Sequence, residues 1–259
     1  MILKPLKSGF FYTLPPNSFS MLVHTKAIVI SALKYGEADL IVKLYTLSDG
    51  LRTYMLKGVL KSRRGKFKAS MFQSLTQLDI VANHKNTGKL EYLKEAKVNA
   101  NYQSLHTHPV KQALVMFLAE VLKNSIREEE NNEALFHFLE YSLQYLDAAE
   151  KVANFHLLFL LQLTRYLGFQ PQNSTSEAEY FNMLDGVFQE IPTNDYCIEG
   201  NTVDLLKNLL GTEFDALSNI KLNQASRTDF LKMLLLYFEL HIEGFRKPKS
   251  LGVLNEIFG

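Results

Sequence analysis

The segment from Leu51 to Ser70 carries the clearest indication of chemistry in this sequence. It holds seven Lys and Arg residues and no acid, namely Arg52, Lys57, Lys61, Arg63, Arg64, Lys66 and Lys68. Cations at this density meet phosphates and release condensed counterions, which gives sequence-independent and salt-sensitive binding. Tyr54 and Phe67 lie in the same segment and offer ring faces for unpaired bases. The segment predicts a nucleic-acid site; a solvated charged loop, with both rings in the core, is the alternative.

Sequence patterns typical of enzymes do not occur. Neither Gly-x-x-x-x-Gly-Lys-Ser/Thr nor Gly-x-Gly-x-x-Gly is found, so no phosphate-binding glycine loop is recognisable. His106 and His108 have a spacing that metal sites use, but no third ligand follows nearby in the sequence. The single cysteine, Cys197, has no basic neighbour to activate it and reads as a small buried hydrophobe. We therefore expect a protein without catalytic residues, metal or cofactor.

The charge of the chain is divided between its two halves. The net charge is +1 overall, but residues 21–100 hold 14 Lys and Arg against 6 Asp and Glu, a net of +8. Residues 101–259 hold 12 against 21, a net of −9. Such an asymmetry points to nucleic acid or another polyanion as a partner of the first half alone.

The first half has the period of β-strands. Apolar residues alternate over 27–36, 39–47, 51–61, 72–83 and 89–100, and Asp49-Gly50 is a strong hairpin signal. Five strands in about 80 residues, without a helical period between them, favour a small closed barrel. An OB-fold over residues 21–100 is the leading interpretation because its faces and loops bind oligonucleotides, and an SH3-like barrel is the competitor.

The second half has the period of helices. Apolar residues repeat every three to four positions over 110–126, over a segment capped by Asn131 or Asn132, and over 150–167. The last of these is apolar nearly all round, which predicts the central helix of the domain. Thr202 to Leu210 also looks helical, and Ser226 with Asp229 resembles a capping box for a final long helix. The expected fold class is α+β and multidomain, with an OB-fold barrel followed by an all-helical domain over 101–259.

The sequence also bears on location. A lone thiol fits a reducing compartment, and no apolar run approaches the roughly 20 residues of a membrane span. We expect a cytoplasmic protein without membrane contact. Residues 1–20 are a poor secretory signal, and Met21 stands directly before the first regular pattern. Two interpretations of this leader stay open, an upstream choice of start site and a disordered arm.

Short motifs occur in an order that resembles the bacterial RecO family. They are Tyr35-Gly36-Glu37-Ala38-Asp39-Leu40-Ile41-Val42, Asp49-Gly50, Lys57-Gly58, Glu95-Ala96, Tyr166-Leu167-Gly168-Phe169 and Tyr237-Phe238-x-x-His241-x-x-Gly244, followed by Lys249-Ser250 and Leu254. The resemblance covers nearly everything from Met21 onward. It implies an N-terminal OB-fold and a helical C-terminal domain.

The resemblance also implies a function and partners. Members of the family bind and anneal single-stranded DNA. Together with RecR they load the recombinase RecA onto strands coated with single-stranded DNA-binding protein, whose acidic tail docks on the helical domain. An OB-fold RNA-binding protein, a scaffold of another pathway and a nuclease with converging carboxylates such as Asp39, Asp49 and Asp79 remain as alternatives.

The sequence departs from the family pattern in two places. Many relatives carry a four-cysteine zinc module, and residues 172–201 resemble its flanks but retain Cys197 alone. A degenerate, zinc-free insert is therefore expected here. In addition, the start of the predicted central helix has no obvious basic pair, so the contacts with the acidic tail are not assigned to particular residues.

Overall fold

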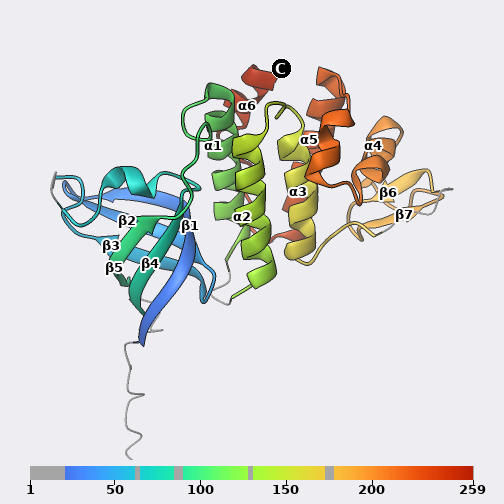
Figure 1. Cartoon of the computed structure of the whole chain (residues 1–259). Helices are drawn as coiled ribbons and strands as arrows, with labels where there is room; N and C mark the ends of the chain where they lie inside the picture. The colour runs from blue at the N-terminus through green and yellow to red at the C-terminus, as the bar shows by residue number, and fades with distance from the viewer. Residues whose placement is uncertain (1–20, 62–64, 85–89, 128–130, 173–177, 259) are drawn as a thin grey trace, which may run out of the picture.

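Strands come first along the chain and helices follow, as the change of period predicts. A computed structural model describes residues 21–61, 65–84, 90–127, 131–172 and 178–258. Figure 1 shows a strongly curved sheet at one end of the molecule, a stack of helices beside it, and a second, small sheet at the far end. The predicted α+β class is therefore confirmed. The leader over 1–20 lies outside the described residues.

The large sheet has five strands in the order β3-β2-β1-β4-β5, and its neighbouring strands are antiparallel. The strands are β1 (Met21–Tyr35), β2 (Asp39–Thr46), β3 (Gly50–Leu56), β4 (Gln77–His84) and β5 (Tyr92–Val98). The first part of β1 pairs with β4 and the later part with β2, with a register shift between Val29 and Ser31. Such a bulge bends a strand, which lets one long strand serve both partners.

Over the described residues the sheet is not closed into the predicted barrel. In the described residues the edge strands β3 and β5 share no continuous ladder, and one isolated parallel bridge, Tyr54 to Glu91, joins this side of the sheet. Around it, the Glu91 amide donates to the Thr53 carbonyl at 3.0 Å and the Met55 amide donates to the Glu91 carbonyl at 2.9 Å. Among the described residues, Glu91 joins the two edges over this short stretch. We call this contact the seam.

The sheet encloses its own small core. Alternate residues of each strand point to the concave side, where Val29, Val42, Leu44, Tyr54 and Leu56 are buried together. The Asp49-Gly50 hairpin forms where it was predicted, with Thr46 paired to Gly50 and Gly50 at a φ of +64°. Glycine has no side chain and adopts this positive φ without steric cost.

The described part of the helical domain, the name kept here for residues 101–259, packs around α3. It is not all-helical as predicted, because it also contains the small three-stranded sheet. Its helices are α1 (Pro109–Ser125), α2 (Glu133–Ala148), α3 (Phe155–Tyr166), α4 (Asn201–Leu209), α5 (Gln224–His241) and α6 (Leu251–Phe258), and the 3-10 helices of the chain are η1 (Ala69–Phe72) and η2 (Phe214–Asn219). Every residue from Phe155 to Leu161 is buried. The central position predicted for this segment is therefore observed, although the helix begins later than predicted.

Two helix starts test the predicted caps. The Asn132 side chain accepts from the Leu135 amide at 2.9 Å, so Asn132 is the cap of α2. The capping box predicted at Ser226 is wrong, because Asn223 caps α5 by accepting from the Ser226 amide at 2.8 Å. The sequence offers several polar residues in a row there. Packing of Leu222 against the core favours the earlier cap.

The two domains are joined by packing and by a clamped linker. Ile28, Ile30 and Tyr45 of the sheet belong to the same core as the helices, and Lys26 Nζ lies 2.8 Å from Glu140 Oε1 on α2. Asp147, near the end of α2, accepts from the amides of residues 103–105 in the linker at 2.7–2.9 Å. The orientation of the sheet domain, residues 21–100, is therefore fixed by apolar contact and by this carboxylate.

Candidate nucleic-acid interface

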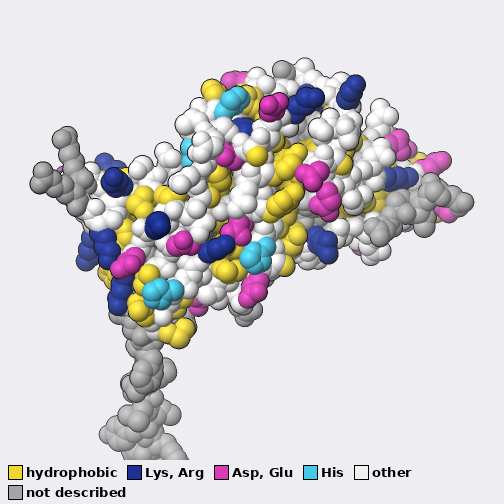
Figure 2. All heavy atoms as spheres, viewed as in Figure 1, with side chains coloured by type: hydrophobic (Ala, Val, Ile, Leu, Met, Phe, Trp, Pro, Cys, Tyr) yellow, Lys and Arg dark blue, Asp and Glu magenta, His cyan; other side chains and the backbone are white. Residues whose placement is uncertain are grey.

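The exposed part of the predicted basic segment lies at the outer end of the sheet domain. Lys57, Lys61, Lys66 and Lys68 are all exposed. Arg63 and Arg64 fall outside the described residues, so their positions stay a prediction. Figure 2 shows dark-blue side chains gathered along this outer edge, away from the helices. The placement of the four described lysines is compatible with phosphate contact at this end of the domain.

Some of these lysines face acids, but the pairs are weak. Lys61 Nζ lies 2.7 Å from Glu37 Oε2, and Lys66 Nζ lies 3.7 Å from Glu95 Oε1, with all four side chains largely exposed. Exposed ion pairs contribute roughly 0–1 kcal/mol and are screened by salt. A phosphate can replace such a carboxylate at little cost, so these lysines remain available to a polyanion.

Arg52 has a different role from the lysines. Its side chain is 12% exposed, its Nε donates to the Asp49 carbonyl at 3.2 Å, and its Nη2 lies 3.7 Å from Asp49 Oδ1. The arginine therefore holds the β2–β3 hairpin together from inside the sheet. This placement does not support the predicted phosphate contact of Arg52, because the charge is already engaged and largely shielded from solvent.

The two predicted stacking rings are placed in the core rather than at the surface. Tyr54 is 0% exposed, and its hydroxyl lies 2.7 Å from His84 Nε2. Burial, together with the nearby Glu91 carboxylate, raises the pKa of the Tyr54 phenol well above its ordinary value, so the ring stays neutral. Phe67 is half-buried and packs edge-to-face on Phe72 with centroids 6.1 Å apart. Neither ring is freely available to a base, which favours the alternative interpretation as core residues.

An exposed ring that the sequence reasoning missed lies close to the basic segment. Tyr92, at the start of β5, is 49% exposed, and Lys57 Nζ sits 5.6 Å from its ring centroid. Both residues lie beside the seam, where β3 and β5 approach. Alternating residues of β5 point to opposite faces, but the sequence does not say which face is outward. That is decided by the pairing at the seam, which buries Glu91 and leaves Tyr92 on the outer face.

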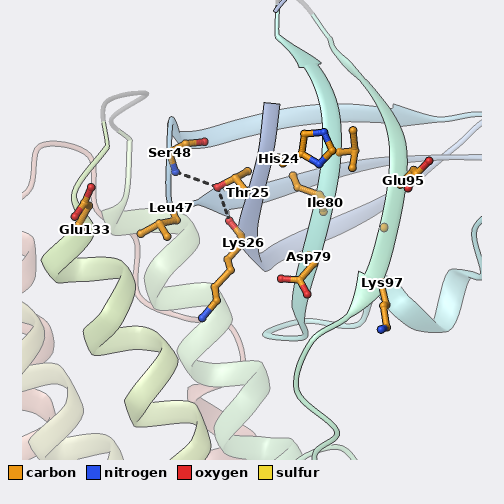
Figure 3. Close-up of a pocket in the computed structure, with 12 residues that line it drawn as sticks. His24, Thr25, Lys26, Leu47, Ser48, Asp79, Ile80, Glu95, Lys97 and Glu133 are labelled. Carbon is orange, nitrogen blue, oxygen red and sulfur yellow. Dashed lines mark hydrogen bonds between the residues drawn. The ribbon is translucent and has the colours of Figure 1, made fainter. Parts of the chain in front are cut away.

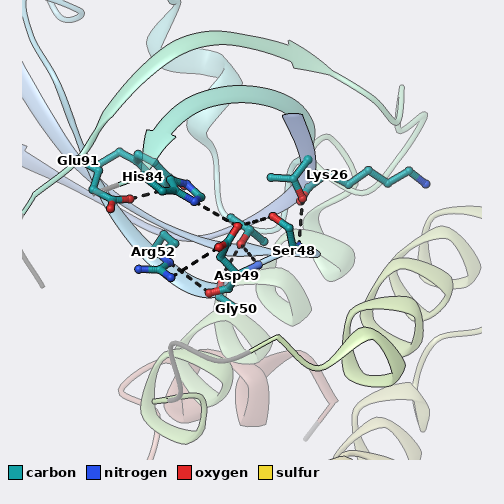
Figure 4. Close-up of polar contacts among 10 residues, drawn as sticks. Lys26, Ser48, Asp49, Gly50, Arg52, His84 and Glu91 are labelled. Atoms are coloured by element: carbon teal, nitrogen blue, oxygen red, sulfur yellow. Dashed lines mark hydrogen bonds and ion pairs between the residues drawn. The ribbon is translucent and has the colours of Figure 1, made fainter. Parts of the chain in front are cut away.

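A buried polar cluster underlies the seam (Figure 4). His84, at the end of β4, is 1% exposed, with Nδ1 3.1 Å from Asp49 Oδ2 and Nε2 3.7 Å from Glu91 Oε2. The cluster links the β2–β3 hairpin, β4 and the start of β5 through polar contacts where ladder hydrogen bonds are sparse. These contacts can hold the seam together. The sequence does not predict the cluster because its members are far apart in the chain.

The groove between the sheet and α2 has no single sign of charge (Figure 3). It encloses about 740 Å³ and is lined by Lys26 and Lys97 but also by Asp79, Glu95 and Glu133. Lys26 points toward α2, where it pairs with Glu140. A mixed lining of this kind does not concentrate a polyanion, so the groove is a poorer nucleic-acid site than the outer edge.

A second groove, of about 520 Å³, lies on the helical domain between the start of α3 and the start of α5. Its apolar lining includes Val152, Leu217, Leu222 and Phe258, and its charged lining consists of Lys151, Lys221, Arg227 and Glu150, with His108 beside them. Lys151 and Lys221 are exposed, whereas Arg227 donates through Nη1 to Asn154 Oδ1 at 3.0 Å and to the Leu222 carbonyl at 3.3 Å. The groove is thus locally basic within an acidic domain.

Comparison with known proteins gives a consistent family assignment. Residues 21–102 match the family model "Recombination protein O N terminal", and residues 106–251 match "Recombination protein O C terminal". The DNA repair protein RecO of Christiangramia forsetii is 77% identical over 239 residues, which cover 92% of this chain and 100% of that protein. The RecO proteins of Flavobacterium psychrophilum and Bacteroides fragilis are 45% and 33% identical over the same shares. The chain belongs to the RecO family.

Membership of the RecO family places this chain among DNA repair proteins, and confirms the resemblance carried by the short motifs. The insert predicted near residues 172–201 contains a small sheet in its described part. Its three strands are β6 (Tyr180–Asn182), β7 (Val187–Gln189) and β8 (Cys197–Glu199). Strands of three residues show too little alternation to be predicted.

Metal-binding side chains are not grouped in the described part of this RecO-family chain. No set of three or more His, Cys, Asp or Glu residues there is placed to hold a metal ion. His106 instead places its Nε2 3.0 Å from the Ser74 carbonyl oxygen, and Cys197 Sγ accepts from Gln189 Nε2 at 3.2 Å. Among the helices whose residues are described, none is both long and apolar enough to cross a membrane.

Proposed function

We propose that this chain is a non-enzymatic recombination mediator. Its sheet domain binds single-stranded DNA without sequence preference, and its helical domain docks partner proteins. Acting with RecR in the bacterial cytoplasm, at the nucleoid, it anneals complementary strands and helps to load RecA onto strands coated with single-stranded DNA-binding protein. The observation that carries the proposal is the exposure of Lys57, Lys61, Lys66 and Lys68 at the outer end of a domain with a net charge of +8.

Counterion release explains why this surface suits a mediator. Each lysine that meets a phosphate displaces condensed cations from the strand, and the gain does not depend on the base. Phosphate contacts position a strand without reading its sequence. Annealing requires this property, because both complementary strands must be held while their bases stay free to pair.

The groove of the helical domain supports docking of an acidic peptide tail. Lys151 and Lys221 stand exposed beside an apolar lining that includes Leu217 and Leu222. Apolar side chains of a short peptide fit such a lining, and its carboxylates pair with the lysines. The domain has a net charge of −9, so the two lysines must outweigh the average field, and binding should weaken as salt screens the pairs.

A peptide titration against the full-length chain tests the docking step. The acidic C-terminal tail of the cognate single-stranded DNA-binding protein should bind at low salt, and the variant carrying Lys151→Ala and Lys221→Ala should lose that binding. Lys232→Ala is the matched control, because Lys232 is exposed on α5 and pairs with Asp229 away from the groove lining. Absence of binding at low salt would contradict this step.

An annealing assay tests the function as a whole. Complementary strands precoated with the cognate single-stranded DNA-binding protein should form duplex faster with the purified chain than without it. No nucleotide or metal should be required. A strong preference for structured RNA would support an RNA-binding protein instead. Binding that is absent at every salt concentration would support a scaffold, and metal-dependent cleavage of the strands would support a nuclease.

A further inference from the structure

Four residues line up across the convex face of the sheet domain. Leu33 on β1 pairs with Ile41 on β2, and Ile41 pairs with Met55 on β3. Across the seam, Tyr54 bridges Glu91 and both side chains are buried, so the residues that follow them, Met55 and Tyr92, share the opposite face. We call Leu33, Ile41, Met55 and Tyr92 the outer row. With strands about 4.8 Å apart, it spans roughly 14 Å.

The outer row is apolar and faces solvent. Leu33 is 66% exposed and Tyr92 is 49% exposed, while Ile41 and Met55 are half-buried. None of the four belongs to either hydrophobic core or to the partly buried residues packed against them. A continuous strip of exposed apolar side chains on a sheet face is typical of a binding surface rather than of structural packing.

Cations stand on both sides of the row. Lys43 lies two residues beyond Ile41 on β2, where it pairs with Ser31 and Thr53, and it is exposed on one side of the row. Lys57, two residues beyond Met55, is exposed on the other side and reaches the Tyr92 ring. Two acids, Glu37 and Asp39, belong to the β1–β2 connection and the start of β2, at the same end of the row as Lys57.

Two contacts account for those acids. Asp39 accepts from the Gly58 amide at 2.7 Å, and Glu37 pairs with Lys61. Lys61 balances the charge of Glu37, whereas Asp39 keeps its negative charge. The apolar centre is thus flanked by the exposed Lys43 and Lys57, with Asp39 near Lys57, in a domain whose net charge is +8.

This arrangement matches the chemistry of a single DNA strand. Bases present flat apolar faces that stack on aromatic and apolar side chains, and the phosphates lie outside them. An apolar peptide would use the row but not the flanking lysines. A duplex would use the lysines but leave the row unused, because its bases are already stacked.

We propose that unpaired bases of single-stranded DNA lie along the outer row, with one base stacked on Tyr92 and with Lys43 and Lys57 holding phosphates on its two sides. This inference rests on the proposed function and names the surface that carries it. The stacking ring of this chain is then Tyr92, in place of Tyr54 and Phe67.

Tyr92 variants of the full-length chain test the stacking step with a poly-dT oligonucleotide of roughly 20 nucleotides, long enough to exceed one site. Tyr92→Ala should weaken binding about 5-fold to 150-fold, the loss expected for one base stacked on an aromatic ring. Tyr92→Phe should bind like the unchanged chain because the ring remains. Tyr196→Ala is the matched control, since Tyr196 is 40% exposed and lies just before β8 in the helical domain.

Salt dependence separates the roles of the ring and the lysines. Tyr92→Ala should leave the slope of log affinity against log salt unchanged, because no phosphate contact is lost. Lys43→Ala with Lys57→Ala should flatten it by roughly 0.7 for each contact, about 1.4 together. Photocrosslinking with 5-iodouracil in place of thymine gives a readout independent of folding in any variant, and the crosslinked peptide should contain Tyr92.

The outcomes distinguish this inference from the function on which it rests. If the unchanged chain binds no single-stranded DNA at any salt, the proposed function and the inference both fail. If it binds but Tyr92→Ala binds equally well, with the same melting temperature and with the crosslink elsewhere, the inference alone fails. Dimerisation that Tyr92→Ala abolishes would also overturn it, and would assign the row to a contact between copies.

Discussion

The sheet domain and the helical domain use opposite physical means to present a surface. The sheet domain has a small core of its own and displays exposed lysines with a net charge of +8. The helical domain has a net charge of −9 and buries a large, aromatic-rich core around α3. Its locally basic groove depends on two exposed lysines against that average field. Salt should therefore weaken binding to both surfaces, but only the groove of the helical domain adds an apolar lining that selects the shape of its partner.

The difference shows why one total charge is a poor guide to function. A net charge of +1 suggests no polyanion partner, yet the two domains differ by 17 charges, from +8 to −9. Each domain has its own field within about a Debye length, roughly 8–10 Å in physiological salt. A strand on the outer end of the sheet domain is therefore governed by the lysines near it and hardly by the distant acids.

The largest effect is expected from a core substitution in the helical domain. Phe159 on α3 is 0% exposed and its ring lies 5.2 Å from that of Phe138 and 5.9 Å from that of Phe155. Phe159→Ala should lower the free energy of unfolding by about 3–5 kcal/mol, because it removes a buried ring and leaves a cavity. Denaturant titration measures the loss.

The control is Ile191→Ala, at a side chain that is 70% exposed, for which a change within about 0.5 kcal/mol is expected. Where Phe159→Ala remains folded, its affinity for single-stranded DNA should equal that of the unchanged chain. A parallel loss of DNA affinity would break the comparison, since it would place part of the DNA site on the helical domain. Phe159→Leu, with a smaller cavity, keeps the test available if the alanine variant does not fold.

The next effect concerns the basic loop. Replacing Arg63, Arg64, Lys66 and Lys68 by Ala should weaken single-stranded DNA binding about equally for all sequences. If all four contact phosphate, the salt slope should flatten by roughly 0.7 per contact, or about 2.8 in total. Stability should change by less than about 0.5 kcal/mol, because the loop contributes little to the core. Binding measured over a series of salt concentrations gives the slope.

A matched quadruple variant in the other domain sharpens this test. Lys151, Arg165, Lys221 and Lys232 are exposed cations of the helical domain, and their replacement by Ala removes the same charge. The salt slope for naked single-stranded DNA should then stay unchanged. An unchanged slope in the loop variant instead would mean that the loop is merely solvated and that the strand follows another face of the sheet.

A smaller effect is expected at the linker between the two domains. Burial raises the pKa of Asp147, but hydrogen bonds from the backbone amides of residues 103–105 and from the Ser104 hydroxyl outweigh it and leave that pKa below its ordinary value. Asp147→Asn keeps the shape but loses the charge on the acceptor. It should lower the free energy of unfolding at neutral pH by about 1.5–3 kcal/mol, the contribution of hydrogen bonds to a charged group.

The pH dependence gives the sign of this contribution. Since folding lowers the Asp147 pKa, the stabilisation is complete above the unfolded value of about 3.9 and is lost as pH falls through the folded value. The difference between the unchanged chain and Asp147→Asn should therefore shrink below about pH 4. A difference that stays constant down to pH 2 would contradict the assignment of the clamp to the ionised carboxylate.

The sequence predicted those features that depend on neighbours along the chain. Asp49-Gly50 needs one positive φ, and Asn132 needs one amide three residues away, so local chemistry determined both. The sequence does not distinguish Tyr92 from Tyr54 as a stacking ring, because both lie in strands of alternating polarity near lysines. What separates them is the bridge from Tyr54 to Glu91, which buries one face and exposes the other. Pairing between distant segments is not encoded in either alternation.

The smallest effect, a change in melting temperature close to zero, is expected when the chain is dialysed against a metal chelator. This test concerns the small sheet. In zinc modules, thiolates hold the turns and chelators unfold the site. In this chain a side chain amide holds the β6–β7 turn: Asn182 Oδ1 accepts from the amides of Leu184 at 3.0 Å and Asp185 at 3.4 Å, and Nδ2 donates to Asp185 Oδ2 at 2.7 Å. The turn therefore has its polar groups satisfied by an amide side chain, and dialysis against a chelator should leave the melting temperature unchanged.

Cys197→Ser extends the same test to the remaining thiol. The sulfur accepts weakly from Gln189 Nε2 and from the Thr193 amide at 3.4 Å, and a hydroxyl can accept from both. The free energy of unfolding should then change by less than about 0.5 kcal/mol. Asn182→Ala should cost more, about 0.5–1.5 kcal/mol for each hydrogen bond, because it removes the acceptor of the Leu184 and Asp185 amides. One tightly held zinc per chain by elemental analysis, surviving the chelator, would reverse this order and make Cys197 a ligand.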